Sequence, residues 1–291
     1  MVIGRAWLVV LVVGVACFSL QTPASACDFD DPKQRTLRGT AYALDKRQWS
    51  TEAELLGVST DDLFGRIGLG YGFGKGVQLD TNVAHIAVGL LNLDLKWNFL
   101  DLPHFGMSAS VGVIWGHGEW IWILSGLEQR IVANTEIVVL PLSLWASSHL
   151  LEWLQVDLGV RYTHSQVFGD FESDSTLVDG EIGVRQLSMH PSVRFYILEA
   201  LELFVGARLP LYSAIPGAGE ANTSLGEGVY GGARTGTLDK LPFSQQFQLQ
   251  LGARSAMAET TFVTARIHYG KTVQSLYGSA FYPAFGVEHR F

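Results

Sequence analysis

The chain is dominated by short runs in which apolar and polar residues alternate one by one. In the run 90–99, the apolar residues Leu91, Leu93, Leu95, Trp97 and Phe99 alternate with the polar residues Asn92, Asp94, Lys96 and Asn98. Residues 154–163 and 246–254 alternate in the same way. A period of two is the period of a β-strand, whose successive side chains point to opposite faces. The pattern therefore predicts an all-β protein with one apolar and one polar sheet face.

The lengths of the connections indicate which kind of sheet these strands build. We expect twelve strands, at residues 49–56, 64–73, 77–86, 90–99, 105–117, 136–147, 154–168, 184–197, 201–212, 243–257, 259–270 and 281–291. Every second connection is short, whereas the long ones, 118–135, 169–183 and 213–242, all fall on the other side. Short turns at one end and long loops at the other are typical of a transmembrane barrel. Pro141, Pro191 and Pro210 fall inside expected strands and require bulges there.

The last run of the chain, FYPAFGVEHRF, ends on an aromatic residue, Phe291. A terminal aromatic on a strand of alternating polarity resembles the closing strand of bacterial outer-membrane β-barrel proteins. His289 departs from that pattern, because an apolar residue is usual at its position. The resemblance implies one transmembrane antiparallel up-and-down β-barrel of about twelve strands. It also implies that the barrel-assembly machinery recognises Phe291, and that outer-membrane lipid and lipopolysaccharide surround the barrel.

The N-terminus is typical of a secretory signal. A single charge, Arg5, precedes an apolar stretch at 6–20 and the small residues Ala24, Ser25 and Ala26. We expect cleavage after Ala26, a short periplasmic segment at 27–47 and the barrel at 48–291, with both termini periplasmic. Cys27 would then be the first residue of the mature chain, either as a plain cysteine or as a lipidated one.

The polar face of the expected strands carries most of the charged residues that we expect inside the barrel. These lumen candidates are Glu52, Glu54, Arg66, Asp80, Asp94, Lys96, Asp157, Arg161, Arg208, Arg266 and His268. We expect the acidic and basic groups to form opposite walls, with Arg161, Arg208 and Arg266 near one height before strand tilt and shear. Two interpretations remain open at this point: a water-filled pore that selects by charge, or ion pairs that fill the lumen.

The composition and these residues favour one function over two alternatives. A formal net charge of −8 argues against a nucleic-acid partner. We predict passive, porin-like passage of small polar or anionic solutes, without enzymatic activity, cofactor or metal. One alternative is a closed structural or surface-interaction barrel that acts through its outer loops. A less favoured alternative is a lipid hydrolase built from His117, Glu136 and His164 on the outer face, which lacks a serine on the same face beside His164.

Overall fold

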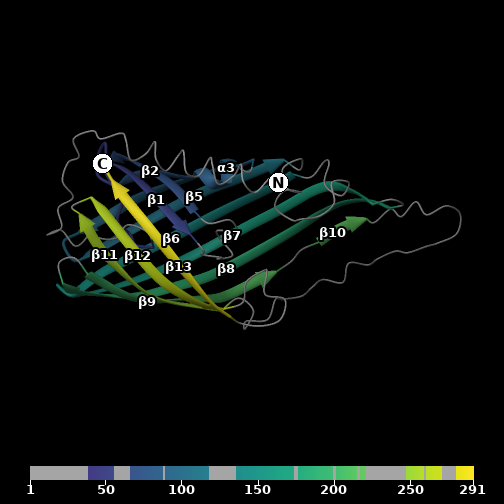
Figure 1. Ribbon diagram of the computed structural model, residues 1–291. Coiled ribbons are helices and arrows are strands. Elements are labelled where there is room, and N and C mark those ends of the chain that lie inside the picture. Colours follow the sequence, from purple (N-terminus) through teal and green to yellow (C-terminus); the bar gives the residue numbers. More distant parts are fainter. Residues whose placement is uncertain are drawn as a thin grey trace, which may run out of the picture.

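The chain folds into a closed antiparallel β-barrel of twelve strands, as the alternation predicts (Figure 1). The structure is a computed structural model, which describes residues 39–55, 66–87, 89–117, 136–173, 176–198, 201–214, 217–220, 247–258, 260–270 and 280–291. The expected signal peptide and Cys27 lie outside these residues. Among the described residues, none of the helices is long and apolar enough to cross a membrane.

Each barrel strand pairs with its neighbours in chain order, and the ends of the chain close the ring. The barrel strands are β1 (Trp49–Leu55), β2 (Arg66–Gly74), β3 (Val77–Asn82), β4 (Leu90–Leu102), β5 (Phe105–His117), β6 (Glu136–Leu151), β7 (Leu154–Ser173), β8 (Thr176–Leu198), β9 (Leu201–Ala214), β11 (Gln248–Ala258), β12 (Thr261–Gly270) and β13 (Ala280–Arg290). β13 pairs with β1, with Ser50 opposite Arg290. A short additional strand, β10 (Gly217–Glu220), pairs with the far end of β8.

Exposure confirms that the barrel is apolar outside and polar inside. On β4, Trp97 is 54% exposed, whereas the adjacent Lys96 is 9% exposed. Leu91, Leu93 and Leu95 are exposed on the same outer face as Trp97. A closed ring has no free strand edge, so every strand finds its backbone partners within the sheet.

Two of the strand predictions were wrong in extent. The third expected strand stops at Asn82, where α3 (Val83–Ala87) begins. Asn82 Oδ1 accepts a hydrogen bond from Ala84 N at 3.1 Å and so caps the helix start. The Asn92 side chain in turn hydrogen-bonds the backbone N–H and carbonyl groups of Asn82.

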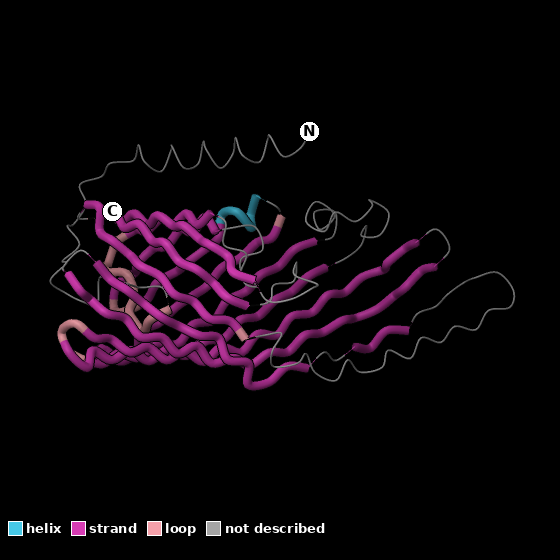
Figure 2. Tube along the Cα trace, turned by 60° about the horizontal axis from the view of Figure 1, so that its bottom comes forward, coloured by secondary structure: helices cyan, strands magenta, loops and turns pink. Residues whose placement is uncertain are grey.

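The loop expected at 169–183 is also mostly strand, because the β7–β8 ladder continues to Ser173 opposite Thr176. β7, β8 and β10 project beyond the other strands at the end away from the short turns (Figures 1 and 2).

Pro141, Pro191 and Pro210 are accommodated by breaks in the ladders. The β8–β9 register shifts where Leu187 and Ser188 face Tyr212 and Pro210. The paired positions of β5 and β6 skip Pro141, and those of β8 and β9 skip Pro191. Since proline has no N–H to donate, interrupted pairing is the expected way to keep it in a sheet.

The segment before β1 turns into the barrel. Residues 39–48, which we call the N-terminal plug, enter the ring at the end that carries the short turns, with residues 45–47 exposed there. Ala41, Tyr42 and Leu44 are at most 2% exposed. The plug therefore fills part of a lumen that is otherwise polar, and it precedes the barrel as an internal rather than a peripheral element.

Candidate functional site: the polar lumen

A polar cavity of about 390 Å³ lies inside the barrel. Ten of the eleven lumen residues expected from the sequence line it: Glu52, Glu54, Arg66, Asp80, Asp94, Lys96, Arg161, Arg208, Arg266 and His268. The eleventh, Asp157, is fully buried nearer the short turns and does not line the cavity. Strand parity brings these side chains together, because every second residue of a barrel strand faces inward.

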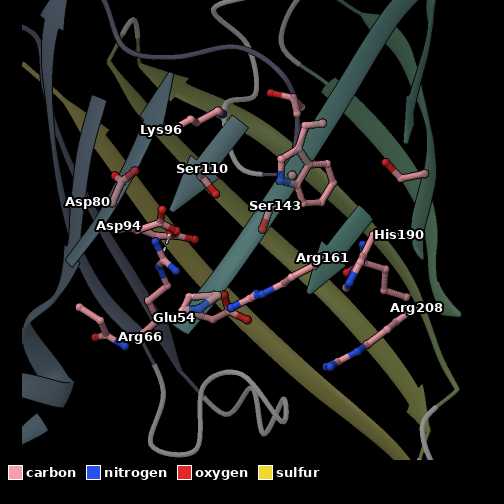
Figure 3. A pocket seen from close by; sticks show the side chains of 18 of the residues that line it. Glu54, Arg66, Asp80, Asp94, Lys96, Ser110, Ser143, Arg161, His190 and Arg208 are labelled. Atoms are coloured by element: carbon pink, nitrogen blue, oxygen red, sulfur yellow. Dashed lines mark ion pairs between the residues drawn. The ribbon is translucent and has the colours of Figure 1, made fainter. Parts of the chain in front are cut away.

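The cavity has walls of different charge (Figure 3). Asp80, Asp94 and Glu54 lie on one side with Arg66, and Arg161 reaches in from the other side, where His190 and Arg208 also lie. The acidic side comes from β1, β3 and β4, and the basic side from β7, β8 and β9. Among the described lining residues, Arg and Lys number seven and Asp and Glu number five. The cavity is therefore locally basic within a chain of net charge −8.

Several lining charges pair with one another. Arg66 Nε lies 3.1 Å from Glu52 Oε2, and Arg266 Nη2 lies 2.9 Å from Glu54 Oε2. Arg254 Nη2 donates to Glu288 Oε2 at 2.7 Å, and Arg290 Nε donates to Glu288 Oε1 at 2.6 Å. Features of both interpretations therefore occur in the same lumen: ion pairs from β2 through β1, β13 and β12 to β11, and a basic surface along the cavity on the other side.

The three arginines expected at one height are offset along the barrel. Arg208 on β9 faces Gln248 on β11, whereas Arg266 on β12 faces Gly252. Gly252 is in register with Phe204, four residues before Arg208. The shear that lets a sheet close into a barrel separates positions that are equally far from their strand ends. Arg266 consequently joins Glu54, and Arg161 and Arg208 remain on the opposite wall.

The N-terminal plug is held at the short-turn end by hydrogen bonds to lumen side chains. Ala41 N donates to Ser147 Oγ, and Leu44 N donates to Gln78 Oε1, both at 2.8 Å. Lys96 Nζ donates to the Tyr42 carbonyl oxygen. The Tyr42 hydroxyl lies 3.0 Å from His149 Nδ1. Three strands of the ring, β3, β4 and β6, thus hold one short segment.

Next to the plug, Asp157 is the centre of a buried polar network. Its Oδ1 accepts hydrogen bonds from Ser147 Oγ and Gln155 Nε2, each at 2.6 Å. Its Oδ2 accepts from Arg194 Nε at 2.6 Å, and Arg194 Nη1 reaches Glu202 Oε1 at 2.7 Å. A buried carboxylate with this many donors has its charge fully compensated, which makes the network a structural element.

Trp145 and His190 also line the cavity, although the sequence prediction did not assign them to it. Their ring centroids are 5.9 Å apart. An aromatic residue at a polar-face position, between Ser143 and Ser147, is the sequence feature that could have identified Trp145. The plug has no such feature, because its residues follow no period of two.

The three residues of the hydrolase alternative do not assemble on the outer face. His117 faces Glu136 across β5 and β6, but Glu136 accepts a hydrogen bond from the Trp115 indole. His164 faces Leu140, four residues along β6 from Glu136. That separation places His164 about 13 Å further along the barrel.

A closed antiparallel barrel with an apolar exterior and a polar, ion-paired interior is the architecture of outer-membrane β-barrel proteins. No protein-family model matches the chain, and no curated protein matches it. Solved structures similar to it include OmpT of Vibrio cholerae (10% identity, 78% of this chain and 65% of OmpT, TM-score 0.40). Others are the CymD monoaromatic hydrocarbon channel (10% identity, 85% of this chain and 89% of CymD, TM-score 0.43) and the NanC porin (8% identity, 83% of this chain and 98% of NanC, TM-score 0.39). At these identities and scores the likeness carries no argument about activity.

Proposed function

We propose that the protein is an outer-membrane barrel whose lumen admits small polar or anionic solutes, and that the N-terminal plug gates its short-turn end. One observation carries the proposal: the plug lies inside the lumen beside a polar, locally basic cavity, and it is a short segment held largely by side-chain hydrogen bonds. Such bonds each contribute only about 0.5–1.5 kcal/mol net. A segment held in this way can leave the lumen without unfolding the ring.

The proposal keeps the expected setting of the barrel. The short-turn end and both termini face the periplasm, and lipid and lipopolysaccharide surround the apolar exterior. The barrel-assembly machinery inserts the chain, and nucleic acid is not a partner. Entry of solute from the long-loop end leads to the cavity, and release to the periplasm requires the plug to move.

Gly72 provides a direct test of the gate. A Cβ atom at Gly72 would lie 2.0 Å from the Asp45 carbonyl oxygen and 2.8 Å from that of Leu44. The plug also pairs with Gly72 through its backbone, since Arg47 N donates to Gly72 O at 2.8 Å. The substitution Gly72→Ala should therefore push the plug away while β2 stays in the barrel. In planar bilayers we expect rare or no openings for the unaltered protein and frequent openings for Gly72→Ala.

Gly286 provides the matched control. A Cβ atom there would lie at least 3.5 Å from its nearest neighbours, which is ordinary contact. Gly286→Ala should therefore behave like the unaltered protein. A Gly72→Ala barrel that is folded, as judged by heat-modifiable migration, but electrically silent would refute gated passage.

The closed structural or surface-interaction barrel is the second candidate. The Asp157 network and the Arg254–Glu288–Arg290 cluster favour it, because both fill the lumen near the short turns. Arg254 and Arg290 also lie 3.9 and 4.8 Å from the ring centroid of Phe262. Silence of both glycine variants would select this candidate. We place the lipid hydrolase third, since His164 lies far from the His117–Glu136 pair.

A further inference from the structure

We propose that the basic side of the cavity is a binding site for an organic anion with a flat, aromatic body. The site, which we call the basic wall, consists of Trp145, Arg161, His190 and Arg208 from β6 to β9. This inference rests on the proposed entry of solutes into the lumen and names their chemical class. The basic wall provides guanidinium groups that bind the acidic group of such a ligand and an indole that stacks on its aromatic ring.

The positive charge comes from two different strands. Arg161 and Arg208 both line the cavity, and their side chains extend toward its open centre (Figure 3). Arg208 Nη2 donates to the neutral amide oxygen of Gln186 at 3.3 Å, so this contact adds no negative charge beside it. A guanidinium is planar and always charged, and it presents paired N–H donors that match a carboxylate.

Three of the four carboxylates on the acidic side have donors on their own side of the barrel. Glu52 and Glu54 are engaged by Arg66 and Arg266 on their own side of the barrel. Asp80 accepts two hydrogen bonds from Gln78 Nε2, both at 2.8 Å. The fourth, Asp94, lines the cavity with an Oδ1 that accepts no hydrogen bond from the described residues. An anion in the cavity would be repelled by Asp94 and drawn to the basic wall, where Arg161 and Arg208 reach in from the opposite side.

The indole of Trp145 provides the flat surface. Gly159 on β7 lies opposite Trp145 on β6, and a Cβ atom at Gly159 would lie 2.4–2.6 Å from three atoms of the indole ring. The indole therefore lies against the strand where a side chain is missing, and Trp145 also lines the cavity. Aromatic rings stack on such a surface with a gain of about 0.5–1.5 kcal/mol beyond area burial.

Titration calorimetry of the full-length protein in detergent, with blank micelle titrations subtracted, tests the site without requiring conduction. The probes are benzoate, acetate, benzamide and benzylamine. We expect benzoate to bind best, with acetate and benzamide each weaker by about tenfold, since each lacks one of the two interactions. Tighter binding of benzylamine than of benzoate would overturn the inference, because the acidic side would then control the cavity.

Single substitutions assign the two parts of the site. Arg161→Gln and Arg208→Gln should each weaken benzoate binding by about tenfold. Trp145→Leu should reduce benzoate binding to the level of acetate and leave acetate unchanged. The matched control is Arg185→Gln, since Arg185 is exposed on β8 and faces His164 on the outer surface. Equal binding of benzoate by all four folded variants would refute the basic wall.

The outcome can be separated from that of the gating proposal. Openings of Gly72→Ala channels without benzoate binding would leave gated passage intact and overturn the basic wall. Benzoate binding that depends on Arg161 and Arg208, in a protein whose Gly72→Ala variant stays silent, would support the basic wall and refute passage.

Discussion

At the scale of the residue, Asp157 shows how a charged side chain can belong to the structure rather than to the site. It is fully buried, and four different side chains donate to its two oxygens. Asp157→Asn would remove the charge that pairs with Arg194 and replace one acceptor oxygen with a donor among side chains that themselves donate. We expect the free energy of unfolding in urea to fall by about 3–5 kcal/mol, as for other buried pairs that lose one partner.

Asp101 provides a matched control for this measurement, since it is exposed near the short-turn end of β4. Asp101→Asn should leave the free energy of unfolding within about 0.5 kcal/mol of the unaltered value. If Asp157→Asn were as stable as Asp101→Asn, Asp157 would not be the centre of a tightly coupled network.

Arg208 and Arg266 separate the two roles that an arginine can have in this lumen. Arg266 contacts Glu54, which is 6% exposed, so Arg266→Gln should mainly lower stability, by about 1–3 kcal/mol. Arg208 contacts a neutral amide, so Arg208→Gln should shift the reversal potential of Gly72→Ala channels toward cation preference. The opposite assignment, with selectivity controlled by Arg266 and stability by Arg208, would contradict the division of the lumen into a paired and a basic side.

At the scale of the element, strand existence could be predicted from the sequence, but strand ends could not. The alternation of β4 predicts its inner and outer faces because lipid and lumen impose opposite polarity on successive residues. The end of β3 depends on a tertiary contact, in which Asn92 bonds the backbone of Asn82. β7 and β8 extend beyond the ring by pairing with each other. There the strands no longer separate lipid from lumen, so apolar and polar residues no longer need to alternate. Neither effect is local to the strand concerned.

The N-terminal plug illustrates the same limit more strongly. Its position depends on Ser147, Gln78 and Lys96, which are distant in the chain and come from three strands. Parity places these three residues in the lumen but does not indicate what they bind. The same reasoning explains why the sequence identified ten cavity residues but left open which arginines pair with carboxylates. The Arg266–Glu54 pair joins β12 to β1 across the intervening strand β13.

The closing seam between β1 and β13 gives the prediction at this scale. Phe291 N donates to Trp49 O at 3.0 Å, and Trp49 N donates to Phe291 O at 2.6 Å. Deleting Phe291 removes this last pair of the ring as well as the terminal aromatic residue. We expect slower and less complete assembly in cells, measured as the fraction of heat-modifiable, protease-resistant protein in the outer membrane. Phe291→Tyr, which keeps the backbone pair and an aromatic ring, should assemble normally. Efficient assembly without Phe291 would show that neither feature is needed.

At the scale of the whole molecule, the structure combines a lipid-compatible exterior with a lumen divided along its length. The short-turn end is filled by the plug and the Asp157 network, and the cavity lies beyond them. The described strands therefore form a ring that is stabilised from within at one end and holds a polar cavity in its middle. This division requires the short-turn end to face the periplasm if the cavity is to receive solutes from outside.

Protease accessibility on whole cells tests that orientation. A cleavage site inserted after Gly219 lies in β10, beyond the barrel wall at the far end. A site inserted after Lys75 lies in the two-residue turn between β2 and β3, where Lys75 has a positive φ of 54°. We expect external protease to cut the first variant on intact cells and the second only after the outer membrane is permeabilised. A periplasmic control protein that stays uncut verifies that the cells are intact. Cleavage at Lys75 on intact cells, with Gly219 protected, would reverse the barrel in the membrane and place the N-terminal plug at the external mouth. The plug would then restrict entry rather than release, although the Gly72→Ala substitution would still displace it.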